Sequence, residues 1–404
     1  MIRNLTTVRG IQCWGAHIGI KSMRRDLAII YSEVPASAAA VFTKNQVIAE
    51  PIKVSQENVA NGRAQVIVCN AGNANACTGQ QGLDGAWAMV KATAAGLQIP
   101  EDHVLVASTG LIGEPFPTED VVNGIETNIK KLSADPKAGS FAANAILTTD
   151  TFAKEGYRDF TLDGKTINMA GIAKGSGMIH PNMGTMLAFV VTDAAISPKL
   201  LQQAVRECTD VTFNMITVDG DTSTNDMVAV LANGLAENEE ITDAQSTDYQ
   251  EFKRNLRDMF THLAKLIVSD GEGASKFVEY RIKGARSEKE ARQLARGISD
   301  STLVKAAMFG RDPNWGRIIC ASGNVGIPFD YTTTDLYIGS REGALQQVLK
   351  QGQPVAFDRN ALKKKLRESH INVELHLHQG KGEATAWGTD LTTDYVMFNS
   401  VYTT

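Results

Sequence analysis

Short apolar runs that end in small polar residues are the feature that most constrains the fold. The runs lie at residues 41–42, 66–69 and 104–106. Runs of this length are typical of buried strands, and the polar segments that follow, at residues 70–75 and 108–110, predict loops. Residues 83–97 and 118–132 have helical periodicity. The first half of the chain therefore predicts a mixed protein in which strands alternate with helices.

The pattern changes past about residue 280, where the elements become shorter. We expect a charged helix at residues 359–368 and strands at residues 317–320, 335–338 and 372–378. Ser287 and Glu290 have the spacing of a capping box, which predicts the start of another helix. This change predicts a main domain of residues 1–280 and a smaller C-terminal domain of residues 281–404.

Length and charge limit the classes of function. The chain has 404 residues, with 40 Lys+Arg against 45 Asp+Glu and a formal net charge of −5. This length exceeds what one hydrophobic core usually fills. A chain of pI about 5.9 lacks the positive surface that holds nucleic acid or an anionic membrane. With no secretory signal pattern and no apolar stretch of membrane-spanning length, the sequence predicts a cytoplasmic protein without such partners.

Several common site patterns are missing from the sequence. It has neither the glycine-rich fingerprint of a dinucleotide site nor a P-loop, so a nucleotide cofactor has little support. His376 and His378 alternate on a predicted strand without a third ligand nearby in sequence, which favours an exposed strand face over a metal site. The 5 cysteines form no CxxC pair and predict buried free thiols: Cys13, Cys69, Cys77, Cys208 and Cys320. We therefore expect no metal and no bound cofactor.

Residues 171–193 contain a glycine-rich turn followed by an apolar strand at residues 186–191, and Thr185 immediately precedes this strand. If the Thr185 hydroxyl attacks the Gly184 carbonyl, an N-to-O acyl shift gives an ester that water can cleave. Thr185 then becomes an N-terminus whose α-amine, of unperturbed pKa about 7.7–8.0, can act as base for its own hydroxyl. Gly184 has no Cβ and leaves the scissile carbonyl open to attack. Taken alone, the Gly-Thr pair also fits an ordinary strand start.

Further short motifs occur along the whole chain, before and after the Gly184–Thr185 pair. In order they are NAGNANACTG (70–79), STGLIG (108–113), TTDT (148–151), AKGSGMIHPNM (173–183), DGDTSTND (219–226), GEGASKF (271–277) and FGRDPNWGRI (309–318). With these motifs the sequence resembles the ornithine acetyltransferase family, also called glutamate N-acetyltransferase or ArgJ, over essentially its full length. The segment 219–226 could support the nucleophile's strand or be a hydrogen-bonded buried loop, and we expect 309–317 to be structural.

The resemblance implies a fold and a processing step. The implied fold is α+β, a layered αββα-like sandwich similar to N-terminal nucleophile hydrolases, with a smaller C-terminal α/β domain. The implied processing is self-cleavage between Gly184 and Thr185, which gives an α chain of residues 1–184 and a β chain of residues 185–404. The family usually has Ala before the nucleophile, whereas this chain has Gly184, so the completeness of cleavage stays open.

The resemblance also implies the reaction and the residues that perform it. The acetyl group of N2-acetyl-L-ornithine would pass to Thr185 and then to L-glutamate, in the cyclic route of arginine biosynthesis. Thr109 and Gly110 would stabilise the oxyanion. The implied substrate-binding residues are Thr149, Thr151, Lys174, Thr185, Glu272, Asn399 and Thr404. Which of Thr149 and Thr151 contacts the substrate stays open.

Other functions use the same motifs. A bifunctional enzyme would also make N-acetylglutamate from acetyl-CoA and glutamate. An N-terminal-nucleophile aminopeptidase would use water as the acceptor, and an uncleaved ligand-binding protein would have lost turnover. The family further implies a homo-oligomer of αβ units.

Overall fold

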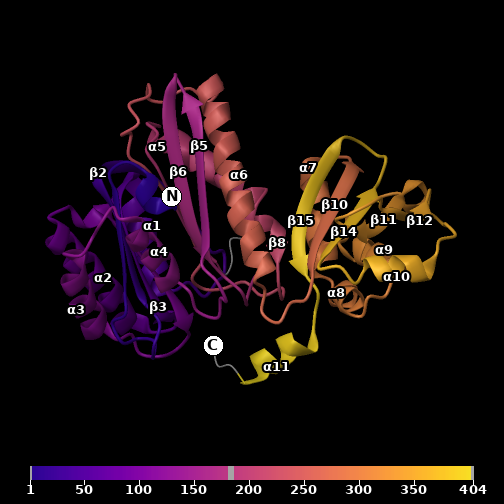
Figure 1. Ribbon diagram of the computed structural model, residues 1–404, viewed down its shortest axis with the longest axis horizontal. Helices are drawn as coiled ribbons and strands as arrows, with labels where there is room; N and C mark the ends of the chain where they lie inside the picture. The colour runs from indigo at the N-terminus through magenta and orange to yellow at the C-terminus, as the bar shows by residue number, and fades with distance from the viewer. Residues whose placement is uncertain (1, 181–185, 402–404) are drawn as a thin grey trace.

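The computed structural model describes residues 2–180 and 186–401, and it contains two β-sheets with helices packed on them (Figure 1). Gly184, Thr185 and Thr404 lie outside the described residues. The predicted class, an α+β protein with layered helices and sheets, is confirmed.

The first sheet has 8 strands in the order β4-β3-β2-β9-β7-β6-β5, with β1 paired to β2. Its strands are β1 (Ile11–Ala16), β2 (Leu27–Phe42), β3 (Arg63–Asn73), β4 (Val104–Leu111), β5 (Lys154–Leu162), β6 (Lys165–Lys174), β7 (Leu187–Thr192) and β9 (Met227–Ala232). Every residue of β7 and β9 is buried, and the two strands run parallel. Burial on both faces explains why these strands are continuous apolar runs rather than alternating ones.

The second sheet has 7 strands in the order β13-β12-β11-β14-β10-β15-β8. Its strands are β8 (Ile216–Thr217), β10 (Phe277–Ala285), β11 (Asp335–Ser340), β12 (Gln346–Lys350), β13 (Gln353–Pro354), β14 (His370–His376) and β15 (Gly382–Thr389). β8 comes from the middle of the chain and pairs with β15, and β10 runs through residue 280. The division into domains at residue 280 stays a prediction.

Helices cover the sheets and fill the space between them. They are α1 (Glu50–Asn58), α2 (Gly79–Leu97), α3 (Thr118–Ile129), α4 (Pro136–Ala145), α5 (Pro198–Asp210), α6 (Thr247–Ser269), α7 (Glu288–Asp300), α8 (Thr302–Phe309), α9 (Trp315–Asn324), α10 (Arg359–Lys365) and α11 (Thr393–Val401). Short 3-10 turns lie at Leu5–Thr7, Val59–Asn61, Glu101–His103, Phe213–Met215 and Tyr331–Thr333. The long helix α6 lies between the β5–β6 hairpin and the second sheet (Figure 1). One hydrophobic core joins α5 and α6 to strands of both sheets.

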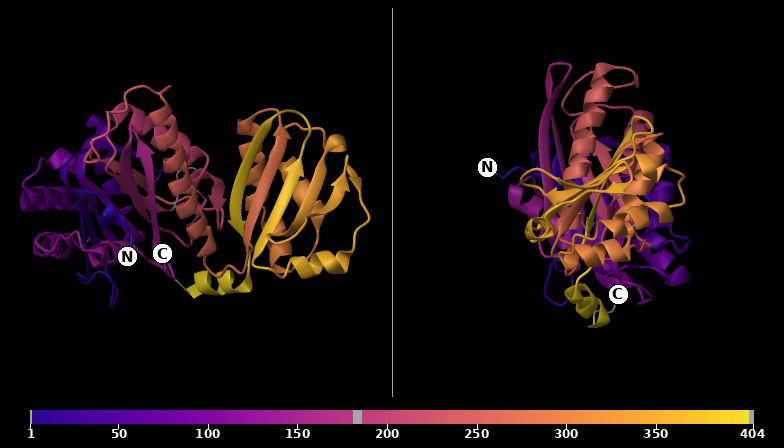
Figure 2. Two further views of the ribbon diagram at one scale, coloured as in Figure 1. Left: turned by 45° about the horizontal axis from the view of Figure 1, so that its top comes forward. Right: turned by 90° about the vertical axis from the view of Figure 1, so that its right-hand side faces the viewer.

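The chain returns to the junction of the two sheets at its C-terminal end. After β15, α11 runs back beneath the second sheet toward the first (Figure 2). The helix is described as far as Val401.

Three local predictions from the sequence are wrong. Residues 317–320, expected as a strand, belong to α9, where Ile318, Ala321 and Ser322 are the buried positions. This spacing is helical, and a short apolar run by itself does not distinguish the two structures. The sequence predicts loops at residues 70–75 and 108–110. Residues 70–73 instead continue β3 and residues 108–110 continue β4, and these two stretches pair in parallel register. Pairing with a buried neighbour keeps these small polar residues extended.

Other local predictions are confirmed. The Ser287 hydroxyl caps α7 by accepting from the Glu290 N–H at 3.3 Å. Strands occur at Asp335–Ser340 and His370–His376 and a helix at Arg359–Lys365, as the C-terminal pattern indicates. The expectation of buried thiols holds for Cys13, Cys69 and Cys208, whereas Cys77 and Cys320 are exposed. Within residues 2–180 and 186–401, no helix has the length and apolar character needed to cross a membrane.

Candidate active site

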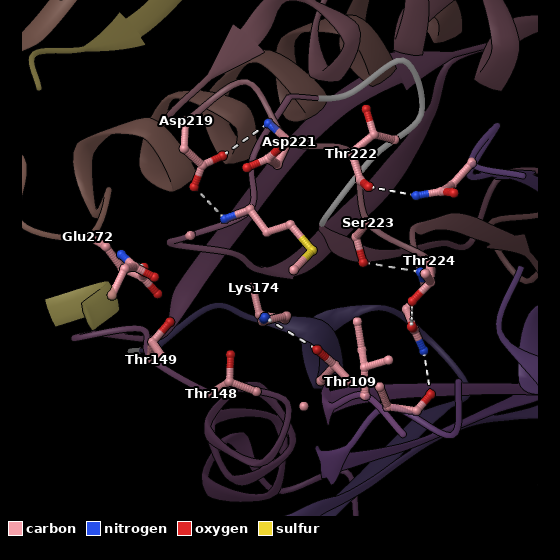
Figure 3. Close-up of a pocket in the computed structure, with 18 of the residues that line it drawn as sticks. Thr109, Thr148, Thr149, Lys174, Asp219, Asp221, Thr222, Ser223, Thr224 and Glu272 are labelled. Carbon is pink, nitrogen blue, oxygen red and sulfur yellow. Dashed lines mark hydrogen bonds between the residues drawn. The ribbon is translucent and has the colours of Figure 1, made fainter. Parts of the chain in front are cut away.

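A cavity of about 430 Å³ opens where strand ends and loops of both halves of the chain converge (Figure 3). β4 and β6 contribute from the first sheet, and α11 contributes from the C-terminal end. Most of the lining residues have hydroxyl, amide or charged side chains: Asn45, Thr109, Thr148, Thr149, Lys174, Asp219, Asp221, Thr222, Ser223, Thr224, Asn225, Glu272, Tyr395 and Asn399. Ala74, Gly110, Ile112, Gly177 and Met178 complete the lining. The polar lining suits a small charged metabolite.

The end of β4 places Thr109 and Gly110 in the cavity wall. Gly110 has φ 132° and lies beside Gly72 of β3. A Cβ at Gly110 would be 2.3 Å from the Gly72 carbonyl carbon, so only glycine fits this position. The Lys174 ammonium donates to the Thr109 hydroxyl oxygen at 3.4 Å. Since the lysine uses a lone pair of that oxygen, the Thr109 hydrogen stays available to a ligand.

Lys174 itself is buried at the end of β6, next to a charged network. The Lys154 ammonium bonds to Asp150 at 2.7 Å and to Asp270 at 2.6 Å, and all three side chains are buried. Burial raises the pKa of Asp150, but the ammonium groups of Lys174 and Lys154 outweigh it and lower that pKa to about 2. Asp150 therefore stays ionised at physiological pH.

The structure separates Thr149 from Thr151. Thr149 lines the cavity together with Lys174 (Figure 3). Thr151 does not, because its hydroxyl donates to the Asp270 carboxylate and its N–H donates to the same group at 3.0 Å. Of these two threonines, Thr149 is therefore the one that faces the cavity.

Glu272 and Asn399 meet at the side of the cavity formed by the chain's C-terminal end. The Asn399 amide donates to a Glu272 carboxylate oxygen at 3.0 Å. The loop that carries Glu272 approaches α11 closely, since a Cβ at Gly273 would be 2.4 Å from the Tyr395 nitrogen. The first turn of α11 is thereby fixed against the cavity.

The segment 219–226 holds the chain on either side of residues 181–185. The Asp219 carboxylate accepts from the N–H groups of Met178 at 2.6 Å and Ile179 at 2.8 Å. Beyond residue 185, the Asp226 carboxylate accepts from the Met186 N–H at 2.5 Å. Burial raises the pKa of Asp226 well above its ordinary value. Asp219 and Asp226 thus fix both approaches to the predicted cleavage position.

Sequence reasoning missed several lining residues. Tyr395 donates its hydroxyl to Asp219 at 3.2 Å, and burial raises the pKa of this phenol. Thr148 and Thr222 through Asn225 also face the cavity. Thr148 and the segment 219–226 belong to motifs that the sequence shares with the family, so these motifs could have indicated that the residues lie at the site. Tyr395 lies in no such motif.

The histidine pair predicted on a strand face engages separate carboxylates. His376 bonds to Glu374 at 3.1 Å, and His378 bonds to Asp335 at 3.0 Å. In the part of the chain that the structure describes, no group of three or more His, Cys, Asp or Glu residues could hold a metal ion.

The family model described as the ArgJ family matches residues 12–404. This chain belongs to the ArgJ family. It is 48% identical over 403 residues to the arginine biosynthesis bifunctional protein ArgJ of Shouchella clausii, covering 99% of this chain and 96% of that relative. It is 47% identical over 402 residues to the protein of the same name from Listeria monocytogenes serotype 4b, covering 99% and 98%. The predicted family and the assignment to an acetyltransferase of arginine biosynthesis are confirmed.

Solved structures of the ArgJ family match part of the chain. The crystal structure of arginine biosynthesis bifunctional protein ArgJ from Bacillus halodurans is 45% identical and covers 45% of this chain and 94% of its own, with a TM-score of 0.43. Ornithine acetyltransferase of Mycobacterium tuberculosis, complexed with ornithine, is 32% identical and covers 45% of this chain and 95% of its own, with a TM-score of 0.40.

Proposed function

We propose that this ArgJ-family enzyme transfers the acetyl group of N2-acetyl-L-ornithine to L-glutamate through an acetyl-Thr185 intermediate. The supporting observation is the cavity that joins Thr109, Gly110, Lys174 and Glu272. The described residues on both sides of Thr185 are anchored next to this cavity.

The charges of the cavity fit the two substrates. The Lys174 ammonium complements the α-carboxylate that both substrates carry, and the Thr149 hydroxyl can donate to the same group. Glu272 complements the terminal ammonium of ornithine. When glutamate replaces ornithine, the Asn399 amide can turn from Glu272 to donate to the second carboxylate.

Turnover follows from the self-contained nucleophile. Once the Gly184–Thr185 bond is cut, the neutral α-amine of Thr185 takes the proton of its own hydroxyl, and the oxygen attacks the acetyl carbonyl. The Thr109 hydroxyl and the Gly110 N–H stabilise the negative oxygen that forms. The proton passes to the departing α-amine of ornithine, leaving acetyl-Thr185. The α-amine of glutamate then attacks this ester, and the steps reverse to release N-acetylglutamate.

Cleavage does not separate the two chains, because they share the first sheet. β6 of the α chain pairs with β7 of the β chain, and β2 of the α chain pairs with β9. We propose an enzyme of paired α and β chains, assembled as a homo-oligomer in the cytoplasm, with no metal and no bound cofactor.

Acetyl-CoA is a second acetyl donor in this proposal. The relatives at 48% and 47% identity are named bifunctional proteins. Supplying acetyl-CoA and glutamate without acetylornithine, and measuring N-acetylglutamate, tests this activity by itself.

Mass spectrometry of the purified protein and a transfer assay test the main proposal together. We expect a cut between Gly184 and Thr185 and formation of N-acetylglutamate from acetylornithine and glutamate. Thr185→Ala should abolish both, whereas Thr185→Ser should keep a measurable part of each. Deacetylation of acetylornithine that proceeds equally without glutamate would instead identify a hydrolase. An uncut chain that binds acetylornithine without turnover would identify a binding protein.

A further inference from the structure

A second depression shares part of its wall with the candidate active site. It has a volume of about 520 Å³ and is bordered by Gly110 and Thr148, which also line the first cavity. Residues 20–24, between β1 and β2, form its other side. A third depression of about 460 Å³ continues from it across Arg24. We call these two depressions the basic groove, and its defining residues are Lys21, Met23, Arg24, Arg25 and Phe152.

The basic groove has an excess of positive charge. Among the described residues, Lys21, Arg24 and Arg25 form no ion pair with a carboxylate, and their side chains donate hydrogen bonds to backbone carbonyl oxygens. The nearby carboxylate of Asp26 is buried and accepts from backbone N–H groups at 2.6 and 2.9 Å. Asp150 also lines the third depression, but its carboxylate is buried and bonded to the Lys154 ammonium at 2.7 Å. Burial lowers the pKa of Lys21 to about 8, which leaves its ammonium largely charged at pH 7. Arg24 is exposed and is the cation most available to an anionic ligand, whereas the Arg25 guanidinium also lies 3.8 Å from the centroid of the Phe141 ring.

Exposed apolar side chains lie beside these cations. Met23 is 89% exposed and Phe152 is 40% exposed. A ligand that suits this surface carries phosphates for the cations, an apolar arm, and a flat ring for the aromatic side chain. Its reactive end must reach Gly110, where the oxyanion forms.

We propose that the basic groove binds the nucleotide and pantetheine portions of acetyl-CoA, so that the thioester reaches the active site past Gly110 and Thr148. This inference rests on the proposed use of acetyl-CoA as a donor. The Thr185 oxygen attacks the thioester carbon and forms a carbon–oxygen bond, and the carbon–sulfur bond breaks when the resulting oxyanion collapses. The proton of the hydroxyl passes through the α-amine to the departing sulfur, which leaves as the CoA thiol.

Arg24→Ala tests the groove with two donors. Arg24 borders both depressions, and its guanidinium donates to a backbone carbonyl oxygen at 3.4 Å. Loss of a charge-assisted contact to phosphate should raise the KM for acetyl-CoA about tenfold more than the KM for acetylornithine. Arg24→Lys should recover part of the loss. Acetylated N-acetylcysteamine, a thioester without phosphates, should serve the wild type and Arg24→Ala equally, and 3′,5′-ADP should compete with acetyl-CoA in the wild type only.

Arg359→Ala is the matched control, because Arg359 is also an exposed arginine and pairs with Asp312 away from the groove. It should change neither KM.

If the KM for acetyl-CoA is the same in the wild type and Arg24→Ala, the groove is not the binding site, and the proposed function stands. The wild type could make no N-acetylglutamate from acetyl-CoA but still transfer the acetyl group from acetylornithine. That result would reject both the proposed binding of acetyl-CoA in the groove and its proposed use as a second donor, and the main reaction would stand. If the wild type catalyses neither reaction, the proposed function itself is rejected.

Discussion

Thr149 and Thr151 lie close together in the sequence, yet their side chains have different surroundings. Thr149 faces the candidate active site, and Thr151 holds the buried Asp270 carboxylate. Thr149→Val should therefore raise the KM for acetylornithine about tenfold with little effect on stability. Thr151→Val should instead lower the free energy of unfolding by about 1–3 kcal/mol, because Asp270 loses a donor. Steady-state kinetics and thermal unfolding of both variants check this, and the reverse assignment would contradict it.

The position of Gly110 leaves no room for a side chain. Its φ of 132° is strained for other residues, and a Cβ would meet the backbone of β3. Gly110→Ala should destabilise the fold and stop transfer. Thr109→Val separates catalysis from stability, because it removes only the hydroxyl that Lys174 contacts, and it should lower kcat by about 10²–10³. Thr109→Ser should keep most of the rate. A Thr109→Val enzyme of normal kcat would show that this hydroxyl does not stabilise the oxyanion.

At the scale of elements, the sequence predicts what depends on local pattern. The apolar runs give β3, β4 and β7, and the Ser287 spacing gives the start of α7. The pattern fails where pairing with a neighbouring strand determines the local structure. The polar end of β4, for example, stays extended because it pairs with β3. It fails at α9 because a short apolar run fits both a strand and one helix face.

The same limit applies to the site. The motifs mark Thr109, Lys174 and Glu272, which the fold brings into one cavity. Tyr395 reaches Asp219 across 176 positions of sequence, and no periodicity in the chain predicts that contact. The position of α11 depends on tertiary packing around Gly273, which only the structure shows.

The placement of α11 makes it part of the proposed substrate site. Asn399→Ala removes the amide that contacts Glu272, and we expect the KM for both acetylornithine and glutamate to rise about tenfold. Ser400→Ala is the matched control, since Ser400 is an exposed neighbour on the same helix whose hydroxyl donates to the Met397 carbonyl oxygen within it. Equal KM values in Asn399→Ala and Ser400→Ala would remove α11 from substrate binding.

At the scale of the whole molecule, Lys305 connects parts of the chain that lie far apart in sequence. This buried lysine of α8 donates to the carbonyl and hydroxyl oxygens of Thr389, at the end of β15. Asp219, from the loop at the candidate active site, and Asp390 are among the carboxylates that act on it electrostatically. The junction of the two sheets therefore contains a cation enclosed by groups from several elements.

Burial of Lys305 gives the fold a specific dependence on pH. Burial lowers the pKa of Lys305 from 10.5 to about 8, although the surrounding carboxylates act in the opposite direction. Between these two values the unfolded chain binds more protons at this position than the folded chain, so the contribution of Lys305 to stability increases as the pH rises. The increase approaches about 1.4 kcal/mol per pH unit.

In Lys305→Met this contribution is missing, and the unfolding free energy of the wild type minus that of the variant should grow from pH 8 to pH 10. Denaturant unfolding of both proteins across this range measures the difference. A difference that stays constant with pH would mean that Lys305 titrates in the folded protein as it does in the unfolded chain.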